Sequence, residues 1–389
     1  MAALIRLPGR GAPLAVPEPG WAAGYPAPRS RRVFAAAHVA AAPGPDGRPV
    51  IDWESTLRFR EHLWAHGFGV AEAMDTAQRG MGLSWARARE LIARTAARAG
   101  AASSGPGGAR PLACGAGTDQ LADGGEHGLG AIIDAYAEQV AFVQSAGAQV
   151  ILMASRALAA RARGPRDYLE VYGELLKQAD RPVILHWLGE AFDPALRGYW
   201  GGDGFDAAAA TVLELIDRAG GQVDGVKLSV LDAAREVSLR RRLPAGVRLY
   251  TGDDFNYASL IRGDADGSHS DALLGAFAAI TAPAAAALAA LDRGDLAGYD
   301  AAMEPTVPLS RLIFEPPTYH YKAGVAFLAW LNGLQPQFVM LDGLERARSA
   351  GHLSRLFELA TAAGALIKPE LAAERMGEML ARSAHPGPV

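Results

Sequence analysis

The chain has very little cysteine, no long apolar run and no strong excess of either charge. Cys114 is the single cysteine among 389 residues, which excludes an internal disulfide, and we expect a reducing, cytoplasmic location. Lysine and arginine total 38 against 42 aspartates and glutamates, a balance that argues against a nucleic acid partner. No apolar run reaches the roughly 18 residues of a membrane span, and the first residues lack the apolar stretch of a signal peptide. We therefore expect no membrane partner.

From residue 33 onward, short apolar runs alternate with longer amphipathic stretches. The runs are candidate strands and cover residues 32–39, 67–73, 110–117, 148–155, 181–187, 224–230, 246–252 and, weakly, 263–270. Helices are predicted between them, over 53–66, 85–99, 132–146, 167–179, 207–219 and 270–291. This α/β alternation, repeated over about 250 residues, predicts a closed (β/α)8 TIM barrel. An open doubly wound sheet is the alternative, but no glycine-rich dinucleotide motif follows the first strand.

The segments outside the barrel have different compositions. Residues 1–32 are rich in proline, glycine and arginine and are expected to form an N-terminal arm, either extended over the surface or disordered. We expect the barrel over 33–292. Beyond it the pattern is purely helical, with helices predicted at 295–314, 318–333, 350–363 and 369–383. Residues 293–389 are therefore predicted to form a C-terminal helical extension.

Polar side chains cluster at the predicted carboxyl ends of the strands, where TIM barrels hold their active sites. They are His38, Glu72, Asp75, Thr76, Thr118, Asp119, Ser155, Arg156, His186, Lys227, Ser229, Thr251, Asp253, Asp254, Ser268 and His269. The pair Asp253–Asp254 also suits the cap of a following helix. Cys114 is flanked by apolar residues and is interpreted as a packing residue.

Lys227 interrupts an otherwise apolar strand, Gly225-Val226-Lys227-Leu228. If its side chain points inward, burial disfavours the ammonium form and lowers its pKa. A neutral amine attacks carbonyl carbon and forms an imine. If the side chain points outward, it lies between helices and has no such role. His186 ends another apolar strand, where it is either a proton-transfer group or a hydrogen-bonded core histidine.

A series of segments follows in a characteristic order: Pro182–Trp187, Gly225–Ser229, Leu249–Asp254, Gly267–Ser270, Leu291–Asp295 and Pro316–Gly324. Their order and spacing, over about residues 33–335, resemble the dihydrodipicolinate synthase / N-acetylneuraminate lyase family of class I aldolases. The resemblance implies that Lys227 is the Schiff-base lysine of strand six. It also implies that His186 stands where a proton-shuttling tyrosine is usual. A homodimer or homotetramer is expected from the same likeness.

One segment departs from this family. Asp75-Thr76-Ala77-Gln78-Arg79 aligns with the Gly-Thr-Thr-Gly-Glu motif that grips the substrate carboxylate through hydroxyls and backbone N–H groups. One threonine remains, and both glycines are replaced. The chain therefore resembles a divergent bacterial branch of the family, whose substrate differs from pyruvate.

The sequence predicts a Schiff-base-forming lyase or dehydratase that acts on a keto acid or a sugar-derived carbonyl compound. Lys227 would form the imine, His186 would transfer protons, and no cofactor or metal is expected. The predicted substrate-binding residues are Thr76, Asp75, Asp119, Arg156, Ser229, Asp253 and His269. A metal-dependent isomerase or hydrolase remains an alternative, with candidate ligands His38, Glu72, Asp119, His186 and His269. A non-catalytic barrel that binds a small molecule is the third.

Overall fold

The computed structural model describes residues 2–103, 110–122 and 124–384, and the chain divides into two compact units. Unit 1 comprises Met1–Ser30, Ala37–Phe68 and Gly275–Val389. Unit 2 comprises Arg31–Ala36 and Gly69–Leu274. The division therefore groups the first residues with the C-terminal helices and ends the barrel unit at Leu274, whereas the sequence analysis placed the barrel boundaries at 33 and 292.

Unit 2 contains a closed barrel of parallel strands, which confirms the predicted (β/α)8 fold. Within the described residues the strand order around the barrel is β10-β11-β12-β3-β6-β7-β8-β9. The bounds are β3 Val33–Ala36, β6 Gly69–Glu72, β7 Leu112–Ala116, β8 Gln149–Leu152, β9 Val183–Leu188, β10 Val223–Ser229, β11 Arg248–Thr251 and β12 Asp271–Leu274. Every one of these strands is short, and most of their residues are buried, as is typical of parallel sheets covered on both faces.

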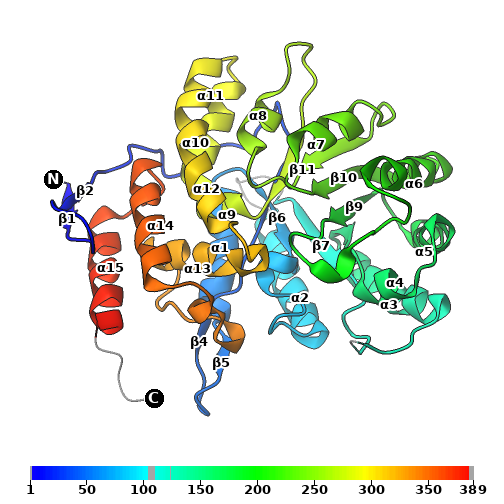
Figure 1. Cartoon of the computed structure of the whole chain (residues 1–389), viewed down its shortest axis with the longest axis horizontal. Coiled ribbons are helices and arrows are strands. Elements are labelled where there is room, and N and C mark those ends of the chain that lie inside the picture. The colour runs from blue at the N-terminus through cyan, green and yellow to red at the C-terminus, as the bar shows by residue number, and fades with distance from the viewer. Residues whose placement is uncertain (1, 104–109, 123, 385–389) are drawn as a thin grey trace. The chain divides into compact units, whose positions relative to one another are not determined.

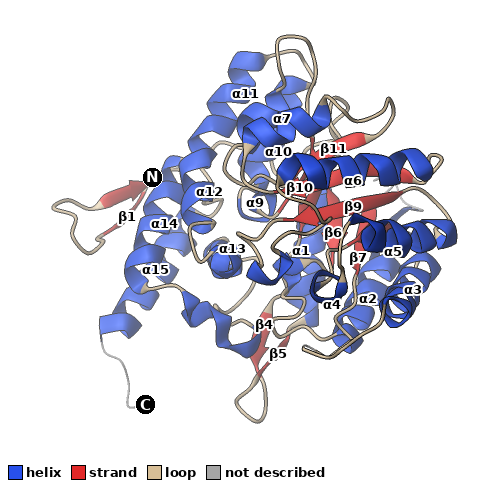
Figure 2. Ribbon diagram, turned by 45° about the vertical axis from the view of Figure 1, so that its right-hand side comes forward, coloured by secondary structure: helices blue, strands red, loops and turns tan. Residues whose placement is uncertain are grey.

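Helices of unit 2 lie outside the strands of the barrel (Figures 1 and 2). They are α2 Trp85–Ser103, α3 Leu129–Ser145, α4 Arg156–Arg161, α5 Pro165–Gln178, α6 Phe205–Arg218, α7 Ala233–Arg240 and α8 Tyr257–Arg262, with short 3-10 turns at η1 Asp75–Ala77 and η2 Pro194–Leu196. Side-chain oxygens cap several of them. Asp232, for example, accepts a hydrogen bond from the backbone N–H of Arg235 at the start of α7.

The eighth strand was predicted wrongly. Residues 263–270 form the loop before it, and the strand itself is Asp271–Leu274. The predicted helix 270–291 is in fact this strand followed by α9 Ala276–Ala279 and α10 Thr281–Leu291. The error arose because Asp271–Leu274 runs into an alanine-rich segment with only Gly275 between them, so the whole stretch has a helical composition.

The barrel interior is filled by apolar side chains from most of the strands. The buried cluster consists of Phe34, Ala36, Ala71, Met74, Ala113, Ile151, Met153, Ile184, Tyr250 and Leu273. Because side chains alternate between the two faces of a strand, this cluster identifies which positions of each strand point inward. Cys114, one position from Ala113, is buried and carries a free thiol, in agreement with a packing role.

Unit 1 is mostly helical. Its helices are α1 Trp53–Ala65, α9, α10, α11 Leu296–Met303, α12 Val307–Ile313, α13 Tyr321–Leu331, α14 Ala350–Ala362 and α15 Pro369–Ala384. Two small antiparallel sheets pair β1 Ala3–Ile5 with β2 Leu14–Val16, and β4 Ala41–Pro43 with β5 Pro49–Ile51. The β1–β2 hairpin lies against α15 (Figure 1), and Trp21 Nε1 donates to the Gly364 carbonyl at 2.7 Å. The N-terminal arm is therefore anchored on the C-terminal helices.

Candidate active site

Lys227 and His186 lie side by side on neighbouring strands. They are register partners between β10 and β9, and Lys227 is also the register partner of Tyr250 on β11. Ile184, two positions before His186, belongs to the interior cluster, as does Tyr250. In-register residues of parallel strands point to the same face, so both Lys227 and His186 point into the barrel, in strands separated by ~4.8 Å.

The Lys227 amine is buried and is close to two carboxylates. Its side chain is 7% exposed, and burial lowers the pKa of Lys227 below its ordinary value. The negative charges of Asp75 and Asp254 oppose part of this shift, because they stabilise the ammonium form. Asp75 lies on η1 after β6, and Asp254 lies in the loop after β11. The arrangement gives an amine that deprotonates more easily than a surface lysine, with anions available to stabilise a cationic imine.

The His186 imidazole is fully buried, and among the residues that the structure describes neither ring nitrogen has a hydrogen-bond partner. Burial, and secondly the charge of Lys227, hold the pKa of His186 well below its usual range. The ring is therefore neutral at physiological pH. Burying polar nitrogens without partners costs stability, and such unsatisfied groups are typical of sites whose partner is a substrate.

Gly252 allows the chain after β11 to approach Lys227 closely. A Cβ built at this position would lie 2.1 Å from Ser229 Oγ, 2.9 Å from the Leu228 carbonyl oxygen and 3.1 Å from Lys227 Cε. These contacts are too short for any side chain, so only glycine fits beside the lysine stem. Ser229, two residues beyond Lys227 on β10, therefore also lies on the interior side, and it is buried.

Asp119 is held by Arg79, which was not foreseen from the sequence. Arg79 Nε donates to Asp119 Oδ2 at 3.0 Å, and its Nη2 pairs with Asp119 Oδ1. The remaining donors of Arg79 bind the carbonyls of Ala73 and Gly115 and the side chain of Gln139 at 3.1, 3.2 and 2.8 Å. Burial alone would raise the pKa of Asp119, but the charge and hydrogen bonds of Arg79 lower it below its usual value. This carboxylate fixes the loop after β7.

The carboxylate of Asp253 accepts hydrogen bonds from residues of its own turn. Its Oδ1 accepts from the backbone N–H groups of Phe255 and Asn256 at 2.9 and 3.0 Å, and its Oδ2 accepts from Asn256 Nδ2 at 2.8 Å. These hydrogen bonds agree with the helix-capping role that the sequence suggested as an alternative for Asp253 and Asp254. Asp254 is not among the predicted substrate-binding residues, yet it is the member of the pair whose charge acts on Lys227.

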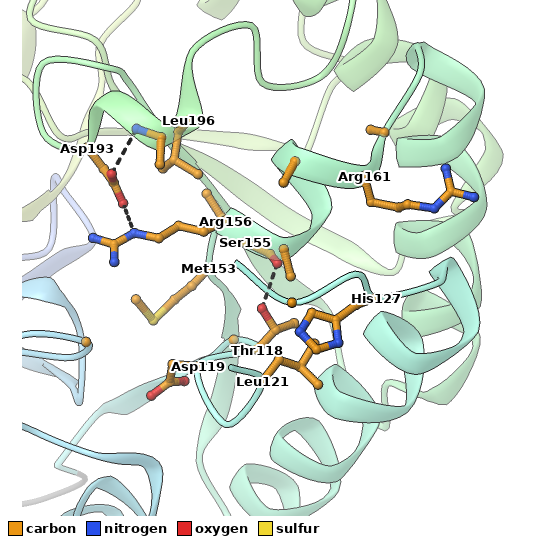
Figure 3. A pocket seen from close by; sticks show the side chains of 18 of the residues that line it. Thr118, Asp119, Leu121, His127, Met153, Ser155, Arg156, Arg161, Asp193 and Leu196 are labelled. Carbon is orange, nitrogen blue, oxygen red and sulfur yellow. Dashed lines mark hydrogen bonds and ion pairs between the residues drawn. The ribbon is translucent and has the colours of Figure 1, made fainter. Parts of the chain in front are cut away.

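A cavity of about 1300 Å³ lies in unit 2, and Lys227 and His186 are not among the residues that line it. It is lined by the loops after β7, β8 and β9, and by Asp75, Asp119 and Arg156 from the predicted substrate-binding set. Thr118 Oγ1 and Ser155 Oγ lie 2.6 Å apart on its wall, and Arg156 Nε donates to Asp193 Oδ2 at 2.6 Å (Figure 3). Thr76 is buried next to Asp75 on η1.

His269 does not lie at the carboxyl ends of the strands. It precedes β12, so it is at the amino-terminal end of the barrel, where its Nδ1 lies 3.1 Å from the Gly267 carbonyl oxygen. Its predicted position was wrong because the eighth strand was placed eight residues too early in the sequence. His269 is therefore excluded from the group around Lys227.

The residues of the metal hypothesis are not brought together. Glu72 accepts from the backbone N–H of Ala73 at 2.8 Å and from Thr95 Oγ1 at 2.7 Å. His38 belongs to unit 1, where its Nε2 lies 2.7 Å from Gln335 Oε1 and burial lowers its pKa to about 4. Across residues 2–103, 110–122 and 124–384, no three His, Cys, Asp or Glu side chains are grouped so as to hold a metal ion.

The fold and site together define a (β/α)8 barrel with a buried lysine and a buried neutral histidine paired at its centre. By sequence, the chain matches the family described as "Protein of unknown function (DUF993)" over residues 13–384, and it belongs to that family. No curated protein matches the sequence. No helix in the described part of the chain is long and apolar enough to cross a membrane.

Solved structures of the dihydrodipicolinate synthase family share this fold, which confirms the predicted resemblance. The enzyme from Oceanobacillus iheyensis is 14% identical with a TM-score of 0.65, covering 86% of this chain and 97% of its own. The enzyme from Aquifex aeolicus is 14% identical with a TM-score of 0.64, covering 87% and 99%. YagE from E. coli K12, solved in complex with pyruvate, is 15% identical with a TM-score of 0.64, covering 85% and 99%. At this identity the likeness establishes the fold.

Proposed function

We propose that the protein is a class I aldolase-type lyase or dehydratase whose Lys227 forms an imine with a keto acid or a sugar-derived carbonyl compound. One observation carries the proposal: Lys227 is the in-register neighbour of His186, and both are buried. Burial lowers the pKa of Lys227, which favours the neutral amine that attacks a carbonyl. The shared fold of the dihydrodipicolinate synthase family supports the same chemistry.

The reaction balances with the groups present and water. The Lys227 amine adds to the carbonyl carbon, and the carbinolamine takes up one proton and loses water to give the protonated imine. In a lyase, a neutral base removes the proton of a β-hydroxyl, and the β carbon leaves as a carbonyl compound when the bond between the α and β carbons breaks. The electron pair of that bond moves toward the imine nitrogen and gives an enamine. Protonation at the α carbon and hydrolysis by water release the product and restore the amine. His186, neutral and next to Lys227, is the proposed base and then the acid.

Asp75 and Asp254 have a supporting role in this scheme. Their charges favour the cationic form of Lys227, so they also favour the cationic imine relative to neutral carbinolamine. Asp75 lines the cavity, where its carboxylate is placed to accept hydrogen bonds from substrate hydroxyls.

Borohydride trapping tests the proposal. The full-length protein is incubated with a panel of keto acids and polyhydroxylated carbonyl compounds, reduced, and weighed intact. We expect a mass increase equal to that of one substrate less one oxygen atom, and peptide mapping should locate it at Lys227. Lys227→Met should abolish the label, whereas the exposed control Lys177→Met should keep it. Labelling that survives in Lys227→Met, or no labelling by any compound, would contradict the assignment.

A further inference from the structure

The cavity that Asp75 lines is much larger than a three-carbon substrate requires. Its volume is about 1300 Å³, whereas sites for drug-sized ligands run to roughly 1,000 Å³. Its lining extends from Asp75, whose charge acts on Lys227, to α4 and the residues that follow it. Asp75 is thus shared between this cavity and the electrostatic surroundings of Lys227, and the cavity continues along the loops after β7 and β8.

Three arginines of one short segment line this space. Arg156 and Arg161 are the first and last residues of α4, and Arg163 follows two positions later. Arg156 points toward Asp193, with which it pairs, and Arg161 extends away from that pair (Figure 3). The backbone N–H of Arg163 donates to Asp167 Oδ2 at 2.6 Å, which fixes the chain after α4.

The charges that line the cavity are unevenly compensated. Asp119 and Asp193 are each paired with an arginine, Arg79 and Arg156 respectively. Within the described part of the chain, the guanidinium groups of Arg161 and Arg163 form no ion pair or hydrogen bond. The other acidic lining residues are Asp75, whose charge acts on Lys227, and Glu126 in the loop after β7. Positive charge is thus left uncompensated on the side of the cavity formed by the end of α4.

We propose that Arg161 and Arg163 form a subsite for an anionic group, a phosphate ester or a carboxylate, at the end of the substrate remote from its carbonyl carbon. The planar fork of arginine matches both oxyanions, and two such groups two residues apart offer several charge-assisted hydrogen bonds. This inference extends the proposed function by naming a substrate class, an elongated carbonyl compound with a terminal oxyanion. The anion subsite itself does not depend on imine formation.

Calorimetric titration with inorganic phosphate and with succinate tests the subsite. We expect saturable binding of at least one of the two probes, weakening as salt is added. Arg161→Gln/Arg163→Gln should weaken it at least about tenfold, since each arginine supplies charged hydrogen bonds. The matched control Arg166→Gln, on the exposed side of α5, should bind as the wild type does, and Glu126→Gln should bind more tightly. Phosphate binding without succinate binding would identify a phosphate ester as the natural group, and the reverse a carboxylate.

The same titrations in Lys227→Met separate this inference from the proposed function. Binding that persists in Lys227→Met and is lost in Arg161→Gln/Arg163→Gln supports the subsite even if no imine is ever trapped. Absence of binding by both probes, or equal affinity in the wild type and the double arginine variant, would overturn it. Trapping of an imine with ribose 5-phosphate at lower concentration than with ribose would connect the two sites.

Discussion

Lys227 of β10 and His186 of β9 are register partners inside the barrel, and both have a pKa below the ordinary value. The charge of Lys227 contributes to the low pKa of His186, while burial lowers the pKa of Lys227 itself. In the proposed function, this lysine with its lowered pKa is the nucleophile and the neutral histidine beside it is the base. Such perturbed pairs are characteristic of catalytic centres.

His186→Phe is expected to keep imine formation and to lose most turnover. Removal of a proton-transfer group typically costs ~10²–10⁴-fold in rate, whereas the lysine that forms the imine remains. Borohydride labelling and steady-state turnover, measured on the same sample, distinguish the two steps. His269→Gln is the control, because His269 lies at the opposite end of the barrel. Full turnover in His186→Phe would remove His186 from the mechanism.

Gly252→Ala is expected to slow imine formation by displacing Lys227. The added Cβ would lie 2.1 Å from Ser229 Oγ and 3.1 Å from Lys227 Cε, so one of them must move. Because Ser229 Oγ is the closest atom, Gly252→Ala/Ser229→Ala should recover part of the labelling rate. The carbonyl oxygen of Leu228, at 2.9 Å from the same Cβ, limits that recovery. A labelling rate in Gly252→Ala equal to that of the wild type would show that the lysine stem tolerates the side chain.

Asp75→Asn is expected to shift the pH dependence of Lys227 reactivity to lower pH. The Asp75 carboxylate favours the ammonium form, so its removal lowers the pKa of Lys227 further. The neutral amine then predominates from a lower pH, and the rate of amine modification rises earlier. Reductive methylation with formaldehyde, followed peptide by peptide against pH, reports this without any knowledge of the substrate. Asp217→Asn, exposed on α6, should leave the profile unchanged. A profile for Asp75→Asn that is unchanged or displaced to higher pH contradicts the prediction.

The fold was predictable from the sequence wherever the strands had clear boundaries. Seven of the predicted runs overlap the strands of the structure, whereas Asp271–Leu274 is separated only by Gly275 from the helical residues that follow. Lys227 and His186 were identifiable because a charged or polar residue within an apolar strand requires an explanation. The Arg79–Asp119 ion pair could not be predicted from the sequence, because its members are 40 residues apart and their contact depends on three-dimensional geometry.

Glu236 is expected to make stability depend on pH. Burial raises the pKa of Glu236 to about 8, despite hydrogen bonds from Ser270 and Thr251. In the unfolded chain the group ionises near its ordinary pKa of about 4.3. Between these two pH values the unfolded chain loses the proton of Glu236, whereas the folded protein keeps it. The protonated group therefore contributes its full stabilisation of the folded state below the unfolded pKa, and this stabilisation is lost as pH rises through 8.

Glu236→Gln should therefore remove this loss of stability at higher pH, because glutamine stays neutral and still forms hydrogen bonds. Urea denaturation at pH 5 and pH 8 should show the variant gaining on the wild type by about 1–4 kcal/mol as pH rises. Glu214→Gln, on the exposed face of α6, should follow the wild type at both values. A difference between Glu236→Gln and wild type that stays constant with pH would place an ionised carboxylate in the folded protein.

Free pyruvate is expected to be a poor imine partner. A small keto acid is held mainly by its carboxylate. Within the segment Asp75–Arg79, Arg79 is the cation that could bind this carboxylate in place of the missing hydroxyl. Its donors are engaged with Asp119, Gln139 and two backbone carbonyls. Asp75 instead places a negative charge near the lysine, and two like charges at about 4 Å repel by roughly 1 kcal/mol even in water.

The Asp75 carboxylate should instead favour binding of a polyhydroxylated carbonyl compound, because it accepts hydrogen bonds from hydroxyls. Incubation with millimolar pyruvate and borohydride should therefore leave the intact mass nearly unchanged, while a polyhydroxylated keto compound labels Lys227. Asp75→Asn should increase pyruvate labelling about fivefold or more, as expected from removing roughly 1 kcal/mol of repulsion. Near-complete labelling of the wild type by pyruvate would show that the carboxylate is gripped in another way, and would at the same time establish Lys227 as the imine-forming residue.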